Sequence, residues 1–141
     1  MSDYAGDIDP KEAWELLAAN PGAQLVDVRT MAEWSFVGIP DLSSVGRQTI
    51  CIEWQNFPEM GLNPQFVAET QAAVRGATAD TPILFLCRSG ARSRGAAIAM
   101  TRAGFSAAYN IAGGFEGDLD STRHRGAKNG WKAAGLPWKQ S

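Results

Sequence analysis

The feature of the sequence that most constrains the fold is a short apolar run followed by a loop and a helix-forming segment. Residues 83–86 are consecutive apolar residues, a pattern typical of a strand buried on both faces of a parallel sheet. An alanine-rich pattern follows and predicts a helix from about Ser93 until Gly104 ends it. A strand, a tight loop and a helix in this order place the loop at the carboxyl edge of an open sheet, where α/β proteins bind their ligands. The stretch therefore predicts an α/β fold with a candidate site in residues 87–92.

The loop has the composition of an anion-binding cup around a cysteine nucleophile. It opens with Cys87, carries two arginines, and contains a glycine that lets the backbone approach the sulfur. A helix N-terminus and nearby arginines favour a thiolate over a thiol. The alternative is an ordinary buried cysteine at the end of a core strand, but burying two arginines without an anion is costly. The sequence therefore predicts Cys87 as the nucleophile, with a substrate-binding loop formed by Arg88, Ser89, Gly90, Ala91, Arg92 and Ser93.

Composition and charge limit the class of protein. The 141 residues suffice for one domain with a proper core, and 45% hydrophobic with 20% charged residues is typical of a globular protein. A net charge of −2 without a basic face argues against nucleic acid as the partner, and no apolar run approaches the roughly 18 residues that span a membrane. The first residues lack the features of a signal peptide, which predicts a cytoplasmic protein. Two cysteines and one histidine cannot supply four zinc ligands, so neither a metal nor another cofactor is expected.

The rest of the chain alternates strand and helix signals. Two capping boxes, Asp9 with Glu12 and Thr30 with Glu33, each predict a helix start. Helices are predicted over residues 9–20, 30–36 and 63–76, and strands over 24–29, 48–52 and 106–110. We also expect a loose tail over residues 1–4, a short edge strand near residues 4–7, a short helical piece at 115–116, and a closing helix and turn over 131–138.

These motifs resemble, in their order, those of the rhodanese-like sulfurtransferases. In that family the active loop is a cysteine, four intervening residues and often an arginine, between a strand and a helix. The resemblance covers about residues 5 to 138. Its matching pieces are Cys87 to Arg92, Leu25 to Arg29 with Glu33 and Trp34, Ile39 with Pro40, Asn110 to Gly114, and Trp131 with Gly135 to Pro137.

The resemblance implies a single rhodanese-like domain over residues 1–141, with a mainly parallel sheet of about five strands and helices on both faces. It implies a thiosulfate sulfurtransferase. The Cys87 thiolate would take the outer sulfur of an anionic donor such as thiosulfate as a persulfide and pass it to cyanide or to a cellular thiol, small or on a protein. Arg88 and Arg92 would attract the donor, and the loop amides would stabilise the persulfide. In this chain, Val37-Gly38 and Asp41-Leu42 stand where the family usually has Gly-His and Gly-Ala, so hydrogen bonds of the usual histidine are in question.

Two further functions compete with this interpretation. Phosphatases and arsenate reductases on a related scaffold space their cysteine and arginine by five residues, whereas Arg92 comes one position early and Ser93 occupies that place. The shorter loop makes a smaller cup, which suits one sulfur atom better than a phosphoryl group. A non-catalytic rhodanese-like binding or regulatory module is the other alternative, although such modules often lack the cysteine that this chain keeps.

Four other features admit both a functional and a structural explanation. Asp27 and Arg29 end the strand 24–29 near the loop, where they either brace it or form a salt bridge unrelated to chemistry. Cys51, between two isoleucines, is most simply a small buried hydrophobe, and the alternative is a resolving thiol for Cys87. Residues 117–130 form a polar loop over the rim of the site that either selects the substrate or is merely solvated. Within it, His124 is a candidate general base, but a surface position is favoured because an ionised thiolate needs no base.

Overall fold

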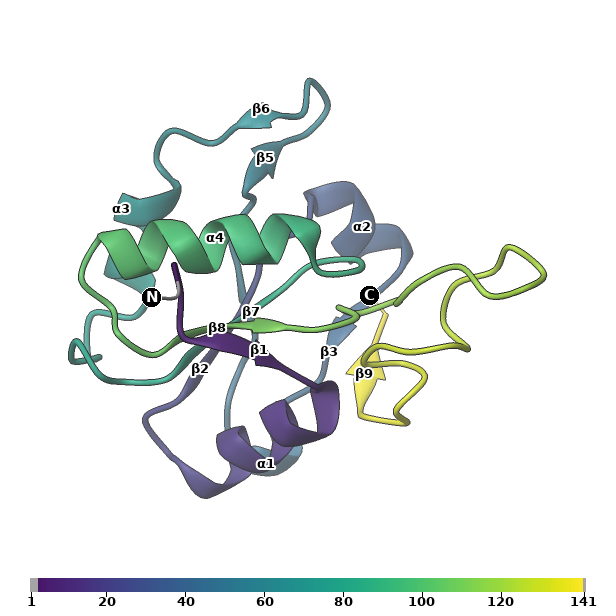
Figure 1. Ribbon diagram of the computed structural model, residues 1–141, viewed down its shortest axis with the longest axis horizontal. Coiled ribbons are helices and arrows are strands. Elements are labelled where there is room, and N and C mark those ends of the chain that lie inside the picture. Colours follow the sequence, from purple (N-terminus) through teal and green to yellow (C-terminus); the bar gives the residue numbers. More distant parts are fainter. Residues whose placement is uncertain (1–2, 141) are drawn as a thin grey trace.

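The structure is a computed structural model that describes residues 3–140. A five-stranded parallel sheet forms its centre (Figure 1). The strands follow the order β1, β8, β7, β2, β4, and every pair of neighbours is parallel. Their bounds are β1 Gly6–Ile8, β2 Gln24–Asp27, β4 Ile50–Cys51, β7 Ile83–Leu86 and β8 Ala108–Ile111. The predicted α/β class and five parallel strands are thus confirmed, with the apolar run 83–86 as the central strand.

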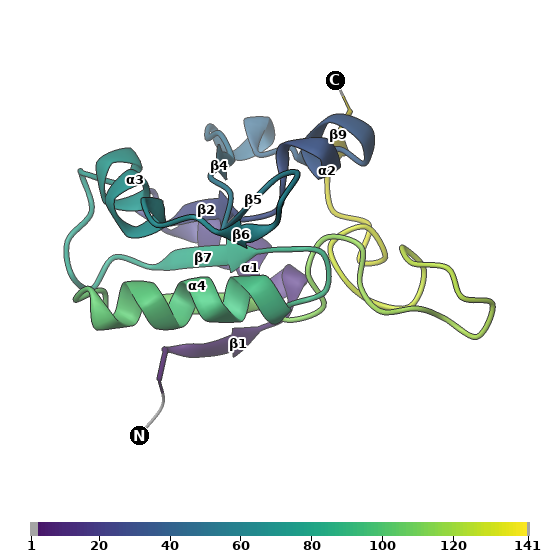
Figure 2. The same ribbon diagram turned by 90° about the horizontal axis from the view of Figure 1, so that it is seen from above.

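Helices cover both faces of the sheet. Helix α1 (Pro10–Ala19) lies on one face, and α3 (Phe66–Ala73) and α4 (Ala91–Arg102) lie on the other (Figures 1 and 2). Successive side chains of strand β7 point to opposite faces of the sheet and so contribute to a hydrophobic core on each face. Ile83 and Phe85 pack toward α3 and α4, whereas Leu84 and Leu86 pack toward α1. All four side chains are fully buried. This two-sided burial explains why the sequence shows an uninterrupted apolar run here.

Both capping boxes form as predicted. The Asp9 carboxylate accepts from the Glu12 N–H, and the Thr30 hydroxyl accepts from the Glu33 N–H at the start of α2 (Met31–Phe36). Two small antiparallel pairs lie outside the main sheet. They join β3 (Ile39–Pro40) to β9 (Trp138–Lys139) and β5 (Gln55–Asn56) to β6 (Gly61–Leu62), while a short 3-10 turn spans Ser43–Val45. The β5–β6 hairpin protrudes from the body of the protein (Figure 1).

Several predicted elements differ in extent or type. Strand β2 ends at Asp27 because that carboxylate accepts the Arg29 N–H, and the predicted strand 48–52 has only two residues. The expected helical piece at 115–116 does not form, because the N–H groups of Phe115 and Glu116 are donated to the loop that follows β7. The predicted closing helix is replaced by turns and by strand β9. In the last two of these segments, contacts with residues distant in sequence take the backbone groups.

The N-terminal segment begins with residues 1 and 2, which lie outside the described residues, so half of the expected tail at 1–4 is not described. Tyr4 packs partly against the core beside α4, and its hydroxyl donates to Asp7. The edge strand expected near residues 4–7 is β1, one or two residues further on. Within residues 3–140, no helix combines the length and the apolar composition needed to cross a bilayer.

The two-sided burial of β7 leads to a test by truncation. We expect Leu84→Ala to lower the free energy of unfolding by about 2–5 kcal/mol, because it removes apolar contacts and leaves a cavity in a fully buried site. Urea denaturation followed by circular dichroism measures the change. Phe36→Ala is the control, because that side chain is 81% exposed and its loss should cost less than about 0.5 kcal/mol. Equal losses for both variants would contradict this account of the core.

Candidate functional site

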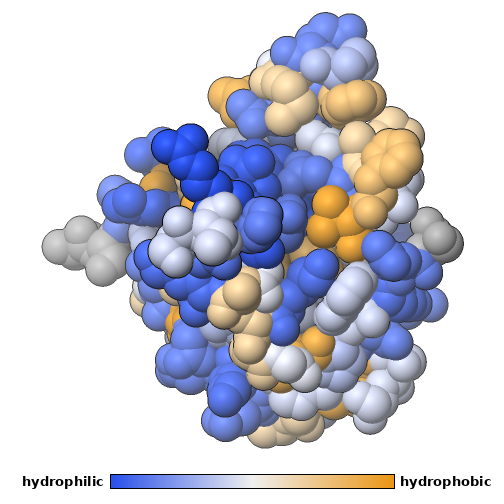
Figure 3. Space-filling view, turned by 90° about the vertical axis from the view of Figure 1, so that its right-hand side faces the viewer, coloured by the Kyte–Doolittle hydropathy of each residue, from blue (hydrophilic) through white to orange (hydrophobic). Residues whose placement is uncertain are grey.

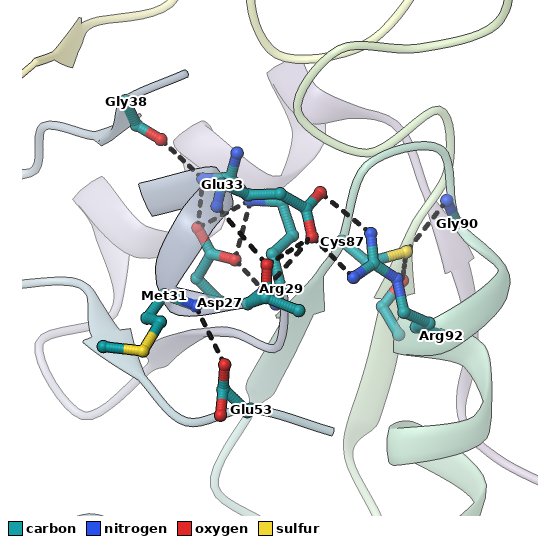
Figure 4. A network of polar contacts seen from close by, with 11 residues as sticks. Asp27, Arg29, Met31, Glu33, Gly38, Glu53, Cys87, Gly90 and Arg92 are labelled. Carbon is teal, nitrogen blue, oxygen red and sulfur yellow. Dashed lines mark hydrogen bonds and ion pairs between the residues drawn. The ribbon is translucent and has the colours of Figure 1, made fainter. Parts of the chain in front are cut away.

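Cys87 follows β7 directly and lies at the carboxyl edge of the sheet, before the N-terminus of α4. Its Sγ accepts a hydrogen bond from the Gly90 N–H at 3.1 Å (Figure 4), and the Ser93 hydroxyl oxygen lies 3.2 Å from the same sulfur. Gly90 has φ +121°, which favours glycine and allows its N–H to turn toward the sulfur. The Cys87 residue is only 1% exposed. The structure therefore combines a polar cradle for the sulfur with almost complete shielding from bulk water.

The Gly113-Gly114 turn holds the backbone of the cysteine loop. The Phe115 N–H donates to the Cys87 carbonyl at 2.8 Å, and the N–H groups of Glu116 and Gly117 donate to the Arg88 carbonyl at 3.0 Å. A Cβ on Gly114 would lie 2.5 Å from the Cys87 carbonyl oxygen, and φ at Gly114 is +62°. The turn therefore requires glycine at this position because of a close backbone approach, which is a requirement that sequence reasoning did not identify.

The Arg92 guanidinium is engaged by Glu33, a partner that the sequence did not indicate. The two groups form a bidentate pair with N–O distances of 2.7 and 2.9 Å, and both are about four-fifths buried (Figure 4). Burial acts to raise the pKa of Glu33, but hydrogen bonds and charge from Arg92 outweigh it and hold that pKa below its usual value. Arg92 therefore faces the site with much of its charge balanced by a carboxylate that also caps α2.

Asp27 and Arg29 form a fully buried ion pair with a shortest N–O distance of 2.6 Å. Arg29 also donates to the Gly38 carbonyl at 2.7 Å, and its guanidinium lies 4.3 Å from the centre of the Phe115 ring. The pair thus contacts Phe115, whose N–H donates to the Cys87 carbonyl. Neither Asp27 nor Arg29 forms a side-chain hydrogen bond with the described residues 87–93. Its bracing role remains a prediction.

A cavity of about 550 Å³ opens over the loop and is lined mainly by charged residues. The loop 117–130 contributes Arg125 to this cavity, and its backbone projects from the body of the protein (Figure 1). Arg125 is held in part by donation to the Gly117 carbonyl at 2.6 Å. The lining residues are Glu33, Val37, Gln55, Met60, Arg88, Arg92, Glu116 and Arg125. Of the other predicted loop residues, Ser89 is half-buried, Ala91 is exposed and Ser93 is fully buried beside the sulfur.

His124 lies on the exposed tip of the same loop. Its backbone N–H donates to Asp120, and its ring nitrogen lies 3.2 Å from the Thr122 hydroxyl. It does not line the cavity. These contacts agree with the preferred interpretation of His124 as a surface residue.

Cys51 is not the buried hydrophobe that its neighbours suggested. It ends the edge strand β4 and is exposed, yet surrounding atoms desolvate the thiol and, together with the charge of Asp27, raise the pKa of Cys51 to about 12. Strand β2 lies between β4 and β7, so two strand spacings of about 4.8 Å separate this cysteine from the strand that leads to Cys87. That separation exceeds the reach of a disulfide without backbone movement. The geometry therefore disfavours a resolving role.

Comparisons with known proteins agree with this fold. The family model described as "STR4 middle domain" matches residues 6–141. The crystal structure of Rv0390 from M. tuberculosis superposes with a TM-score of 0.87 at 54% identity, covering 98% of this chain and 99% of that one. A rhodanese-like domain protein from Staphylococcus aureus shares the fold, with a TM-score of 0.52 and 19% identity over 77% of this chain and 86% of that one. A thiosulfate sulfurtransferase GlpE from Actinobacillus pleuropneumoniae is 25% identical over 97% of this chain and 95% of its own.

The parallel sheet, the cysteine loop at its carboxyl edge and these similarities define a rhodanese-like protein. The chain belongs to the family described as the STR4 middle domain, and its fold is rhodanese-like.

The close approach at Gly114 gives a stability test. Gly114→Ala should destabilise the fold by at least about 2 kcal/mol, because the added Cβ meets the Cys87 carbonyl and φ is positive. Gly61→Ala is the matched control, since nothing lies within 4 Å of its Cβ and its φ is not positive. Urea denaturation of both variants measures the difference, and similar stabilities would contradict the proposed packing of the turn on the loop.

The Glu33–Arg92 pair predicts a pH-dependent stability. Because the pKa of Glu33 is lowered in the folded protein, the pair stabilises the fold above the usual glutamate value of 4.5, and this contribution is lost as pH falls through the lowered value. Glu33→Gln, which keeps the capping geometry, should be less stable than the wild type at pH 7, and the difference should shrink below about pH 4. Glu12→Gln at the other capping box is the control, and a difference independent of pH would contradict the prediction.

Proposed function

We propose that this protein is a sulfurtransferase that carries sulfur as a persulfide on Cys87. The observation that carries the proposal is the Cys87 sulfur, which accepts an amide hydrogen bond at a helix N-terminus, in a loop whose Arg88 and Arg92 line a cavity together with Arg125. Such a cradle suits a negatively charged sulfur and an anionic donor. The similarity to a thiosulfate sulfurtransferase supports the same chemistry.

The reaction proceeds by two displacements at sulfur. The Cys87 thiolate attacks the outer sulfur of thiosulfate, the sulfur–sulfur bond of the donor breaks, and sulfite leaves with the electron pair. The product is a Cys87 persulfide whose terminal sulfur carries the negative charge. Cyanide or an acceptor thiolate then attacks that terminal sulfur, the bond to Sγ breaks, and the Cys87 thiolate is regenerated. No metal or other cofactor takes part in the proposed cycle.

Arg88 and Arg125 are proposed as the main cations for the donor. Arg92 shares its charge with Glu33, whereas Arg88 is exposed and forms no ion pair within residues 3–140. Arg125 reaches the same cavity from the loop 117–130, which gives that loop a part in substrate selection. Glu116 also lines the cavity and limits the positive potential there. Because carboxylates line the cavity together with the arginines, the arrangement favours a small anion of low charge. It is less suited to an oxyanion that positive groups must enclose on all sides.

The acceptor in the cell is proposed to be a thiol, either small or presented by a protein. Val37 and Met60 give the cavity an apolar side, and neighbouring Phe36 is 81% exposed. Figure 3 shows the face toward which the strands of the main sheet point, with hydrophobic side chains beside a hydrophilic centre and on the protruding upper part. Such a rim could contact the surface around a protein thiol. A reducing, cytoplasmic setting would keep both thiols available.

Intact mass spectrometry tests the proposal directly. Incubation with thiosulfate should add one sulfur atom to the wild type, and cyanide should remove it. Cys87→Ser should gain nothing, while Cys51→Ser should gain sulfur like the wild type. A protein that gains no sulfur from thiosulfate or from polysulfide would contradict the proposal and favour a binding module. Phosphatase turnover without persulfide formation would contradict it in favour of the other cysteine chemistry.

Kinetics test the proposed division among the arginines. Arg88→Ala and Arg125→Ala should each raise KM for thiosulfate several-fold to about tenfold with a smaller change in kcat, because each removes an attraction for the anionic donor. Arg102→Ala, in the last turn of α4 at the far end from the loop, is the matched control and should leave both constants near the wild-type values. An unchanged KM in both cavity variants would overturn these assignments.

A further inference from the structure

A line of hydrogen bonds runs from the Cys87 sulfur to the edge strand β1. The Ser93 hydroxyl in the first turn of α4 lies 3.2 Å from Sγ and 2.5 Å from Oδ1 of Asn110 in β8. Nδ2 of Asn110 donates to the Asp7 carboxylate at 3.0 Å, and Asp7 and Asn110 are register partners of two neighbouring strands. Ser93 and Asn110 are at least 95% buried, so few other groups can satisfy them.

The carboxylate of Asp7 gives this line a direction. A carboxylate only accepts hydrogen bonds, so it holds the Nδ2 side of the Asn110 amide toward itself. Oδ1 of Asn110, which only accepts, therefore faces Ser93. The Ser93 hydroxyl has one proton, and it must donate that proton to Oδ1. A lone pair of the Ser93 oxygen is then left toward Cys87, where it can accept from a thiol but cannot donate to a thiolate.

We propose that Asp7 and Asn110 are positioning residues that direct the Ser93 proton away from Cys87 and thereby favour its thiol when no sulfur donor is bound. The Ser93 hydroxyl can stabilise the thiolate only by turning toward the sulfur, which leaves the buried Oδ1 of Asn110 without a donor. This opposes the Gly90 N–H and the helix N-terminus, which favour the thiolate. Under the proposed function, the line sets how much nucleophile exists at a given pH.

Other charged groups act on the same sulfur and do not change the direction of the line. Arg88 adjoins Cys87 in the loop, Arg92 approaches it from α4 with Glu33 of α2 behind it, and Glu116 and Arg125 line the cavity above. At the outer end, the Tyr4 hydroxyl donates to the same Asp7 oxygen, and Arg94 lies over the Tyr4 ring. Among residues 3–140, only the Asp7 carboxylate fixes which side of the Asn110 amide faces Ser93.

The test is the pH profile of alkylation by iodoacetamide, in a Cys51→Ser background so that Cys87 alone reports. Asp7→Asn should move the midpoint down by roughly one pH unit, because the Asn110 amide can then turn over and release the Ser93 proton to the sulfur. Ser93→Ala alone should leave the midpoint unchanged or lower it. Ser93→Ala added to Asp7→Asn should raise the midpoint relative to Asp7→Asn. The coupling between the two substitutions is the diagnostic result.

Two controls separate hydrogen-bond direction from loss of charge. Tyr4→Phe removes the other partner of the Asp7 oxygen and should leave the midpoint unchanged. Repeating the series at about 0.5 M salt screens an exposed carboxylate but not a hydrogen bond, so the shift should persist. Ser93→Ala raising the midpoint equally in both backgrounds would overturn the inference, as would an Asp7→Asn midpoint that does not move or moves only at low salt.

Alkylation needs no sulfur donor, so this result is independent of persulfide formation. A protein with the expected coupling that takes up no sulfur would retain the inference and lose the proposed function. A protein that forms the persulfide without the coupling would retain the proposed function and contradict the inference.

Discussion

The site depends on the backbone hydrogen bonds that fix the segment after β7. The carbonyls of Cys87 and Arg88 accept from three consecutive N–H groups, those of Phe115, Glu116 and Gly117. This leaves the N–H of Gly90 free to turn toward the sulfur. Arg29 of the buried Asp27–Arg29 pair lies over the ring of Phe115, which is one of these donors. Strand β7, which is buried on both faces, ends at the carboxyl edge of the sheet and places Cys87 there. The turn after β8 then fixes the backbone of the cysteine loop.

Charge around the sulfur is distributed rather than concentrated. Glu33 balances Arg92, and Glu116 lines the same cavity as Arg88 and Arg125. A partly buried ion pair also fixes geometry, since Glu33 caps α2 and joins that helix to the first turn of α4. Arg92 therefore fixes the position of α2 relative to α4 as much as it adds positive potential to the site. In the proposed function, the cations that remain for a small donor anion come from the loop beside the cysteine and from the segment 117–130.

The sequence predicted what local patterns determine and missed what distant contacts determine. Strand β7 and the two capping boxes depend on neighbouring residues, and they form at the predicted positions. The Glu33–Arg92 pair joins residues 59 positions apart, and Glu33 already had a local explanation as a capping residue. Cys51 was assigned to the core because isoleucines flank it, but β4 is an edge strand and turns the cysteine outward. The closing segment could not be placed because β9 exists only through its pairing with β3.

Hydrogen-bond direction is the property of this site least accessible to sequence. A serine six residues after a cysteine suggests a donor to the thiolate, and the short distance to Sγ taken alone gives the same impression. The direction changes only when Asn110 and Asp7 are considered together, because a carboxylate can accept but not donate. In the proposed arrangement, an exposed residue of the first strand thus acts on a buried sulfur through two side chains that never ionise. The reactivity of such a cysteine follows from the acceptor at the far end of the line as well as from the cations nearest to it.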